Sequence, residues 1–185
     1  MTTPEFVWEK APAELTLPDG EVHVWRADLD QPAARIEKLA WTLSADERER
    51  AGRFHFEQHR MHFIAARGVL RALLGRYLNR VPEQLGFCYS DQGKPALDEK
   101  TGEATLCFNL SHSRTLALYA VTRDRQVGID VEYRRRKVAD EQIADRFFAR
   151  AEVEALEAFP VALREAAFFK CWTRKEAYLQ ARGEG

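Results

Sequence analysis

The sequence lacks the features that mark several specialised classes of protein. Its three cysteines, Cys88, Cys107 and Cys171, are odd in number, far apart and set among apolar residues, which argues against a disulfide framework or a cysteine-rich zinc site. The longest apolar run, residues 116–121, is too short to span a bilayer. The first residues lack the basic and apolar regions of a secretion signal. We therefore expect a soluble, cytoplasmic protein with reduced thiols.

An excess of charge of one sign is also missing. The chain has 28 basic and 29 acidic residues, and its formal net charge is −1. No overall field therefore favours nucleic acid, a membrane surface or an acidic partner, and any electrostatic function must come from a local group of charges. The length of 185 residues suits one domain or two small packed halves.

The hydrophobic patterns of the first half predict a strand followed by helices. A strand is expected at residues 22–25 and a short helix at 35–41. Ser44, followed three residues later by Glu47, forms a capping box that begins a helix at about residue 45. The next helix, 58–78, is the most regular, because apolar residues recur at three- and four-residue steps. Its predicted buried face consists of Met61, Ile64, Ala65, Val69, Leu73 and Tyr77.

Short strands and then helices make up the rest of the chain. The strands are predicted at 87–89, 106–108, 115–121 and 127–131. With turns at 91–95 and 98–102, they indicate a small, mainly antiparallel sheet.

Helices are expected from about residue 139 to 181, with an interruption at Pro160 and a stop at Gly183. A similar order of elements begins twice, so the predicted fold is α+β with two similar α/β lobes, 1–124 and 125–185.

Two acids within the expected strand 127–131 and just after it could bind a cation. Side chains alternate along a strand, so Asp130 and Glu132 would share a face, with their residues about 6.6 Å apart. Two such carboxylates repel each other unless a cation intervenes, and ligation by oxygen alone favours Mg²⁺. Gly128 would let another backbone or a ligand approach closely. An amphipathic strand with its acids in water is the alternative, and this segment alone favours it.

A third acid, Glu176, lies on the last predicted helix. One flank of that helix consists of Phe168, Cys171, Trp172, Lys175 and Leu179. Trp172 is therefore predicted to be a buried anchor. Glu176, beside this flank, could be a third metal ligand or a base that takes a proton from a hydroxyl group. An ordinary surface ion pair is the alternative.

Polar and basic side chains could supply an anion site. Asn109, Ser111 and His112 follow a strand and could donate to a phosphate, although an ordinary turn is equally compatible. A serine hydrolase is disfavoured, because there is no Gly-x-Ser-x-Gly elbow and adjacent Ser111 and His112 would point to opposite sides. Lys94 could add a charge from the turn at 93–95.

Arginines recur on the regular helix and just before it. Arg53, Arg60, Arg67 and Arg71 follow seven-, seven- and four-residue steps. They could form one basic stripe, with Arg50 nearby, and arginine forks suit phosphate oxygens. A solvated helix face is the more frequent meaning of such a stripe. The histidines that share a face, His55, His59 and His62, lack the further ligands of a zinc site.

Three segments taken in order resemble a known family. They are 109–113 (Asn-Leu-Ser-His-Ser), 127–132 (Val-Gly-Ile-Asp-Val-Glu) and 169–177 (Phe-Lys-Cys-Trp-Thr-Arg-Lys-Glu-Ala). Their order and spacing resemble the 4'-phosphopantetheinyl transferases of the larger, surfactin-synthetase-activating type. The resemblance runs from about Ser44 to the last residue. It implies that the two lobes pack as a pseudo-dimer.

The resemblance also implies an activity and a set of site residues. The family moves the phosphopantetheine arm of coenzyme A onto a serine of an acyl or peptidyl carrier protein, as a holo-[acyl carrier protein] synthase does. The metal ligands for Mg²⁺, and the catalytic residues, would be Asp130, Glu132 and Glu176. The residues that contact coenzyme A would be Arg50, Lys94, Ser111, His112 and Lys175. Neither nucleic acid nor a membrane is expected as a partner.

The chain departs from the family pattern at three places. Gln180 stands where many relatives carry a lysine, and Glu47 stands where the surfactin type carries another. The chain stops at Gly185, whereas the family usually continues with strands that complete the second lobe. We therefore expect an incomplete second lobe with an unpaired sheet edge, and a weaker activity or stability than that of a complete member. A non-catalytic module that binds coenzyme A or a carrier protein is the alternative function; nucleic-acid binding is a distant third.

Overall fold

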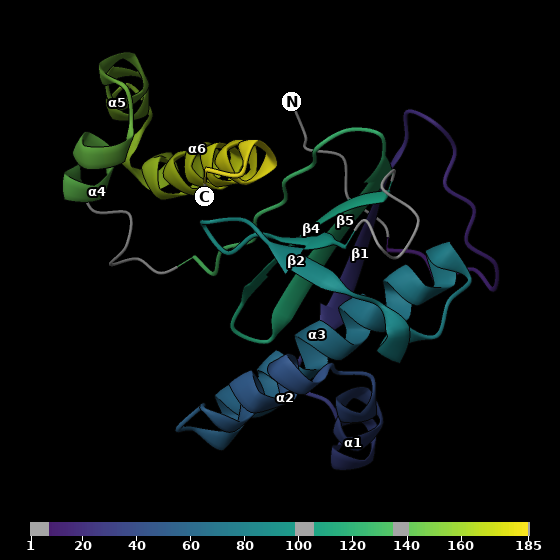
Figure 1. Cartoon of the computed structure of the whole chain (residues 1–185). Coiled ribbons are helices and arrows are strands. Elements are labelled where there is room, and N and C mark those ends of the chain that lie inside the picture. The colour runs from purple at the N-terminus through teal and green to yellow at the C-terminus, as the bar shows by residue number, and fades with distance from the viewer. Residues whose placement is uncertain (1–7, 99–105, 135–140, 185) are drawn as a thin grey trace.

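A three-stranded antiparallel sheet forms the centre of the first half of the protein (Figure 1). The computed structural model describes residues 8–98, 106–134 and 141–184. Strand β5 (Leu116–Arg123) lies between β1 (Val22–Asp28) and β4 (Leu106–Ser113). Tyr119 on β5 stands opposite Trp25 on β1 and Leu110 on β4, so these three side chains share one face of the sheet. The antiparallel sheet predicted from the sequence is confirmed.

Three helices cover that face. They are α1 (Ala33–Trp41), α2 (Ala45–Gly52) and α3 (Glu57–Leu78). The main apolar core lies between the sheet and these helices, and the buried Tyr119 hydroxyl donates to the Ala66 carbonyl of α3 at 3.0 Å. The predicted helices at 35–41, from 45 and at 58–78 are confirmed. So is the predicted core face of α3, in which Met61 and Val69 are partly buried.

A small hairpin follows α3 and a short 3₁₀ turn at Pro82–Gln84. It pairs β2 (Phe87–Tyr89) with β3 (Pro95–Leu97). Gly93 has a positive φ of 83° in the connecting turn, and the Ser90 N–H donates to the Lys94 carbonyl at 3.0 Å. The turn at 91–95 is therefore confirmed. Strand β3 was not predicted, because proline is typical of turns and occurs in strands only at an edge, at the first residue or at a bulge. Most of the other predicted turn, at 98–102, lies outside the described residues.

The second half consists of helices with an apolar cluster of their own. They are α4 (Glu141–Phe147), α5 (Arg150–Glu157) and α6 (Val161–Arg182). The cluster includes Phe148, Phe168 and Phe169, and the Trp172 ring stacks on Phe168 at a centroid distance of 6.1 Å. Trp172 therefore packs on the cluster as predicted, but its side chain is partly rather than fully buried. Gly183 ends α6 with a φ of 75°, as predicted. Residue 139, the expected start of these helices, lies outside the described residues.

The segment that joins the halves is not the strand expected at 127–131. Its backbone N–H groups bond to side chains of β4: Ile129 to Asn109 Oδ1 at 2.8 Å, Val131 to Ser111 Oγ at 3.3 Å and Tyr133 to Ser113 Oγ at 3.0 Å. These side chains stand at every second residue of β4, so they take the place of a backbone ladder. The strand prediction was wrong for this reason.

The expected unpaired sheet edge of the second half is also corrected. The part of that half which the structure describes, 125–134 and 141–184, contains helices and no strand. The lobe boundary at residue 124 stays a prediction. Within the described ranges, no helix combines the length and apolar composition needed to cross a membrane.

Helix α6 contacts this joining segment at a glycine. A Cβ atom placed on Gly128 would lie 1.9 Å from the Ala177 carbonyl oxygen and 2.5 Å from the Ala181 nitrogen. The close backbone approach predicted at Gly128 is confirmed. Figure 1 shows α1–α3 on one side of the strands and α4–α6 on the other. At Gly128, the segment that follows β5 lies directly against the backbone of α6.

Candidate active site

Two of the predicted acids are oriented by serines of β4. The Ser111 hydroxyl donates to Asp130 Oδ1 at 2.9 Å, and the Ser113 hydroxyl donates to Glu132 Oε2 at 3.3 Å. Asp130 is half-buried, and its second oxygen, Oδ2, is buried with no hydrogen-bond partner among the described residues. A buried carboxylate oxygen without a partner is unfavourable unless a cation or a donor meets it.

The charges of Asp130 and Glu132 act on Glu176 of α6. Burial raises the pKa of the Glu176 carboxyl, and repulsion from Asp130 and Glu132 raises it further. Burial also raises the pKa of Asp130, against the opposing hydrogen bonds from Ser111 and Val131. The charges that act on Glu176 are therefore those of the other two predicted acids, and the Gly128 contact joins α6 to the segment that carries them.

The chemistry of these donors, though not their spacing in this structure, suits a hard divalent cation. The acids offer carboxylate oxygens, one of them buried and unpartnered, and a cation there would relieve the mutual repulsion. In the ranges that the structure describes, no group of three or more His, Cys, Asp or Glu side chains is arranged closely enough to hold a metal ion. The acids are therefore coupled electrostatically without being at ligand distances.

A basic cavity lies on the other face of β4. Ser111 and His112 point to opposite faces of the strand, as predicted, with His112 on the side of α3. The cavity has a volume of about 350 Å³. Its lining includes Arg50, Phe63, Arg67, Tyr89, Ser111 and His112. Burial of the imidazole, and to a smaller extent the charge of His62, lowers the pKa of His112, which favours the neutral ring.

Lys94 lies between the hairpin and the joining segment. Its Nζ donates to Gln126 Oε1 at 3.1 Å and to the Val127 carbonyl at 3.3 Å. Burial lowers the pKa of Lys94. With Asn109 and Gln180 it lines a second cavity of about 220 Å³. Gln180 therefore faces the same space as Lys94.

Family models for two adjoining parts of the chain match this protein. The model of the 4'-phosphopantetheinyl transferase superfamily matches residues 126–185. The model described as 4'-phosphopantetheinyl transferase, N-terminal, matches residues 25–123, more than half of the chain.

The chain belongs to the 4'-phosphopantetheinyl transferase superfamily.

The names of similar curated proteins agree with this family assignment. The 4'-phosphopantetheinyl transferase HetI of Nostoc sp. is 49% identical over 98% of this chain and 76% of its own length. The putative transferase slr0495 of Synechocystis sp. is 35% identical over 88% of this chain, and psf-1 of Bacillus pumilus is 34% identical over 85%. The chain spans 65% and 66% of the length of these two relatives. The family predicted from the sequence is confirmed, and the enzyme class with it.

Lys175, which was predicted to contact coenzyme A, lies away from the acids and from the basic cavity. The Lys175 ammonium pairs with Glu152 of α5 and lies 5.1 Å from the centre of the Phe148 ring. It lines an apolar groove of about 890 Å³ between α5 and α6. The structure therefore does not bring Lys175 to the acids or to the basic cavity.

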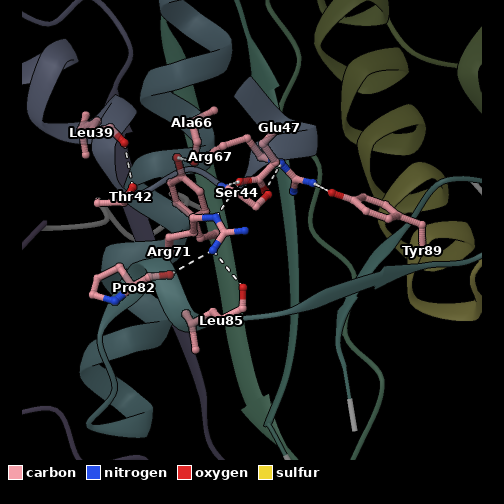
Figure 2. A network of polar contacts seen from close by, with 11 residues as sticks. Leu39, Thr42, Ser44, Glu47, Ala66, Arg67, Arg71, Pro82, Leu85 and Tyr89 are labelled. Atoms are coloured by element: carbon pink, nitrogen blue, oxygen red, sulfur yellow. Dashed lines mark hydrogen bonds and ion pairs between the residues drawn. The ribbon is translucent and has the colours of Figure 1, made fainter. Parts of the chain in front are cut away.

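The spacing of the arginines did not predict that two of them are buried. Arg53 and Arg60 are exposed and pair with Glu49 and Glu57, as a solvated helix face would. Arg67 and Arg71 instead meet Glu47 inside the protein (Figure 2). A signal for this burial is present, since both arginines stand among apolar and small residues. These are Ala65, Ala66, Gly68, Leu70, Leu73 and Leu74.

Proposed function

We propose that this protein transfers the 4'-phosphopantetheine group of coenzyme A to a serine of an acyl or peptidyl carrier protein, with Mg²⁺ as cofactor. The observation that carries the proposal is the electrostatic coupling of three carboxylates close to a basic cavity. Asp130 has a buried oxygen without a partner, Glu176 feels the charge of both other acids, and Arg50 and His112 line the cavity across β4.

The acids suit the metal and the proton transfer of this reaction. Asp130, Glu132 and Glu176 would hold Mg²⁺, which when bound would neutralise charge on the pyrophosphate. The phosphopantetheinyl group then passes to the serine oxygen, and adenosine 3',5'-bisphosphate leaves. Ser111 keeps Asp130 in place through the hydrogen bond at 2.9 Å. The pKa of Glu176 is raised towards neutral pH. This suits a general base that accepts the proton of the carrier serine.

The basic residues suit the substrate. Coenzyme A is anionic, and phosphate oxygens are bound well by guanidinium, ammonium and backbone or imidazole N–H donors. Arg50 and His112 would bind such oxygens in the cavity on the α3 side of β4, and Lys94 would do so in the adjoining one. Names of the relatives, which are those of phosphopantetheinyl transferases, support the same reaction.

A mass measurement tests this proposal. An apo carrier protein is incubated with coenzyme A, with and without this protein and with and without Mg²⁺, and the intact mass of the carrier is then measured. We expect the mass to rise by one phosphopantetheine group only when protein and Mg²⁺ are both present. An unchanged mass, together with coenzyme A binding by calorimetry, would favour the non-catalytic binding module instead.

A further inference from the structure

The turn between β4 and β5 places an arginine where a glycine is usual. Ser113 of β4 stands opposite Leu116 of β5, so Arg114 and Thr115 alone connect the two strands. Arg114 has a positive φ of 53°. Two-residue hairpin turns require a positive φ at their first central residue and therefore favour Gly, Asn or Asp there. For an arginine this backbone conformation is strained, and the strain points to a role for its side chain.

The Arg114 guanidinium lies over the ring of Tyr133, in the segment that joins the two halves. Its central carbon is 3.4 Å from the ring centre, a distance at which a planar guanidinium is in direct contact with the ring face. The next shortest such contact among the described residues, between Arg71 and Phe87, is 4.8 Å. Both Arg114 and Tyr133 are exposed, and within the described ranges no hydrogen bond or ion pair holds this guanidinium. The contact with Tyr133 is thus the side-chain interaction that can offset the strain of the turn.

The neighbouring residue of the hairpin holds Tyr133 by its backbone. Ser113 Oγ accepts the Tyr133 N–H at 3.0 Å and donates to Glu132 Oε2 at 3.3 Å. A hydroxyl group can accept and donate at the same time, so the two bonds do not compete. Two adjacent residues, Ser113 and Arg114, therefore hold the backbone and the ring of Tyr133, and one of them also bonds to the acid before it.

The register of the joining segment shows what depends on these contacts. The N–H groups of Ile129, Val131 and Tyr133 each bond to a side chain of β4 that lies 20 positions earlier in the chain. This constant offset means that the segment runs beside β4 in the same direction. Glu132 lies between the second and third of these bonds and is exposed, whereas Asp130, between the first and second, is half-buried. Packing therefore restrains Glu132 less than Asp130, and the position of Glu132 depends more on the bond at Tyr133.

We propose that Ser113 and Arg114 form a clamp that holds Tyr133 and thereby positions Glu132 for the transfer reaction. The part of this inference that concerns the reaction rests on the proposed function. Arg114 acts through the ring of Tyr133 and Ser113 acts through the carboxylate of Glu132, so both are positioning residues rather than catalytic ones. The strained turn is retained because it directs the guanidinium onto the joining segment.

Hydrogen exchange of single backbone amides tests the clamp in the metal-free protein. Arg114→Gly removes the guanidinium but suits the positive φ, so the urea midpoint should stay close to that of the wild type. We expect the Tyr133 amide to exchange about two- to fivefold faster by NMR, the factor that an exposed cation–π contact is worth. The Ile129 amide, at the other end of the segment, should exchange at the wild-type rate. Single-turnover transfer to an apo carrier protein should slow by at least about the same two- to fivefold factor.

Conservative variants show which groups the clamp needs. Tyr133→Phe keeps the ring under the guanidinium and should retain the transfer rate, whereas Tyr133→Leu should slow transfer as Arg114→Gly does. Arg114→Gly and Tyr133→Leu combined should slow transfer no further than either alone, since both remove the same contact. Ser113→Ala removes two hydrogen bonds and should slow transfer more, and Ser113→Thr, which keeps the hydroxyl group, should restore it.

Asn79→Gly is the matched control, because Asn79 also has a positive φ, 49°, but lies at the end of α3 and takes no part in the clamp. It should change neither the exchange of the Tyr133 amide nor the transfer rate. If Arg114→Gly matched this control in both measurements, the clamp would be overturned. Faster exchange with an unchanged transfer rate would overturn its positioning role. A wild type without transfer would overturn the proposed function, while the exchange rates would still decide whether the clamp exists.

Discussion

Gly128 is the residue through which the position of Glu176 can be changed without touching an acid. In Gly128→Ala the new Cβ would lie 1.9 Å from the Ala177 carbonyl oxygen, whereas ordinary contact begins at 3.4 Å. The two atoms must therefore separate by about 1.5 Å. Both clashing groups, Ala177 O and Ala181 N, belong to the backbone of α6, so no side-chain rotation can relieve the overlap, and the helix itself must move.

We expect two measurable consequences of Gly128→Ala. Overpacking of this kind destabilises a protein by roughly 1–3 kcal/mol, and contact with backbone places the variant at about 3 kcal/mol. Misplacement of a catalytic group by about 1 Å lowers rates on the order of 100-fold, so kcat/KM for carrier modification should fall by about that factor. Urea denaturation measures the first effect, and the rate of mass gain of the carrier measures the second.

Gly52→Ala is the matched control, because a Cβ placed there meets nothing within 4 Å. At the end of helix α2 this change should leave the stability equal or raise it by about 0.4–1 kcal/mol. If Gly128→Ala had the same stability and the same kcat/KM as Gly52→Ala, the direct contact between α6 and the joining segment would not exist in solution. The reasoning that places Glu176 beside Asp130 would then be refuted.

Three further predictions concern other residues of the site and of helix α6. Asn109→Ala removes the acceptor of the Ile129 N–H and should lower the free energy of unfolding by about 1–3 kcal/mol in urea denaturation, whereas an unchanged value would show that water replaces the bond. The raised pKa values of Asp130 and Glu176 mean that folding binds protons. We compare the melting temperatures of the wild type and of the Asp130→Asn, Glu176→Gln double variant in metal-free buffer. As the pH rises from the ordinary pKa values of 3.8 and 4.5 to the raised ones, the wild-type melting temperature should fall relative to that of the variant. Parallel curves would contradict this. Lys175→Met should leave the Kd of coenzyme A unchanged in calorimetry, and a large rise would show that Lys175 reaches the substrate.

Local patterns predicted the elements whose stability is local or whose apolar face is regular. The steps of three and four residues gave α3, and the Ser44 and Glu47 pair gave the start of α2. Gly183 ended α6 at the expected place, since a glycine tolerates a positive φ. Each of these signals lies within one element, and its physical cause acts over a few residues.

Features that depend on a partner from elsewhere in the chain were missed. The segment 127–131 alternates like a strand, but its N–H groups bond to side chains of β4, which no pattern within the segment indicates. The arginine spacing on α3 fitted an exposed stripe, whereas Arg67 and Arg71 are buried because Glu47 of α2 lies across from them. Sequence spacing specifies which residues share a face, but the charge that meets this face comes from the tertiary fold.

The central claim is that Asp130 and Glu176 act together in a magnesium-dependent transfer from coenzyme A. The most direct measurement is the single-turnover rate at which an apo carrier protein gains mass with Mg²⁺, for Asp130→Asn and Glu176→Gln. Their matched control is Glu165→Gln, which removes an acid of the same helix about three turns before Glu176. The account predicts a wild-type rate in the control and no detectable transfer in either of the other variants. Transfer at the control rate in Asp130→Asn or Glu176→Gln would contradict it.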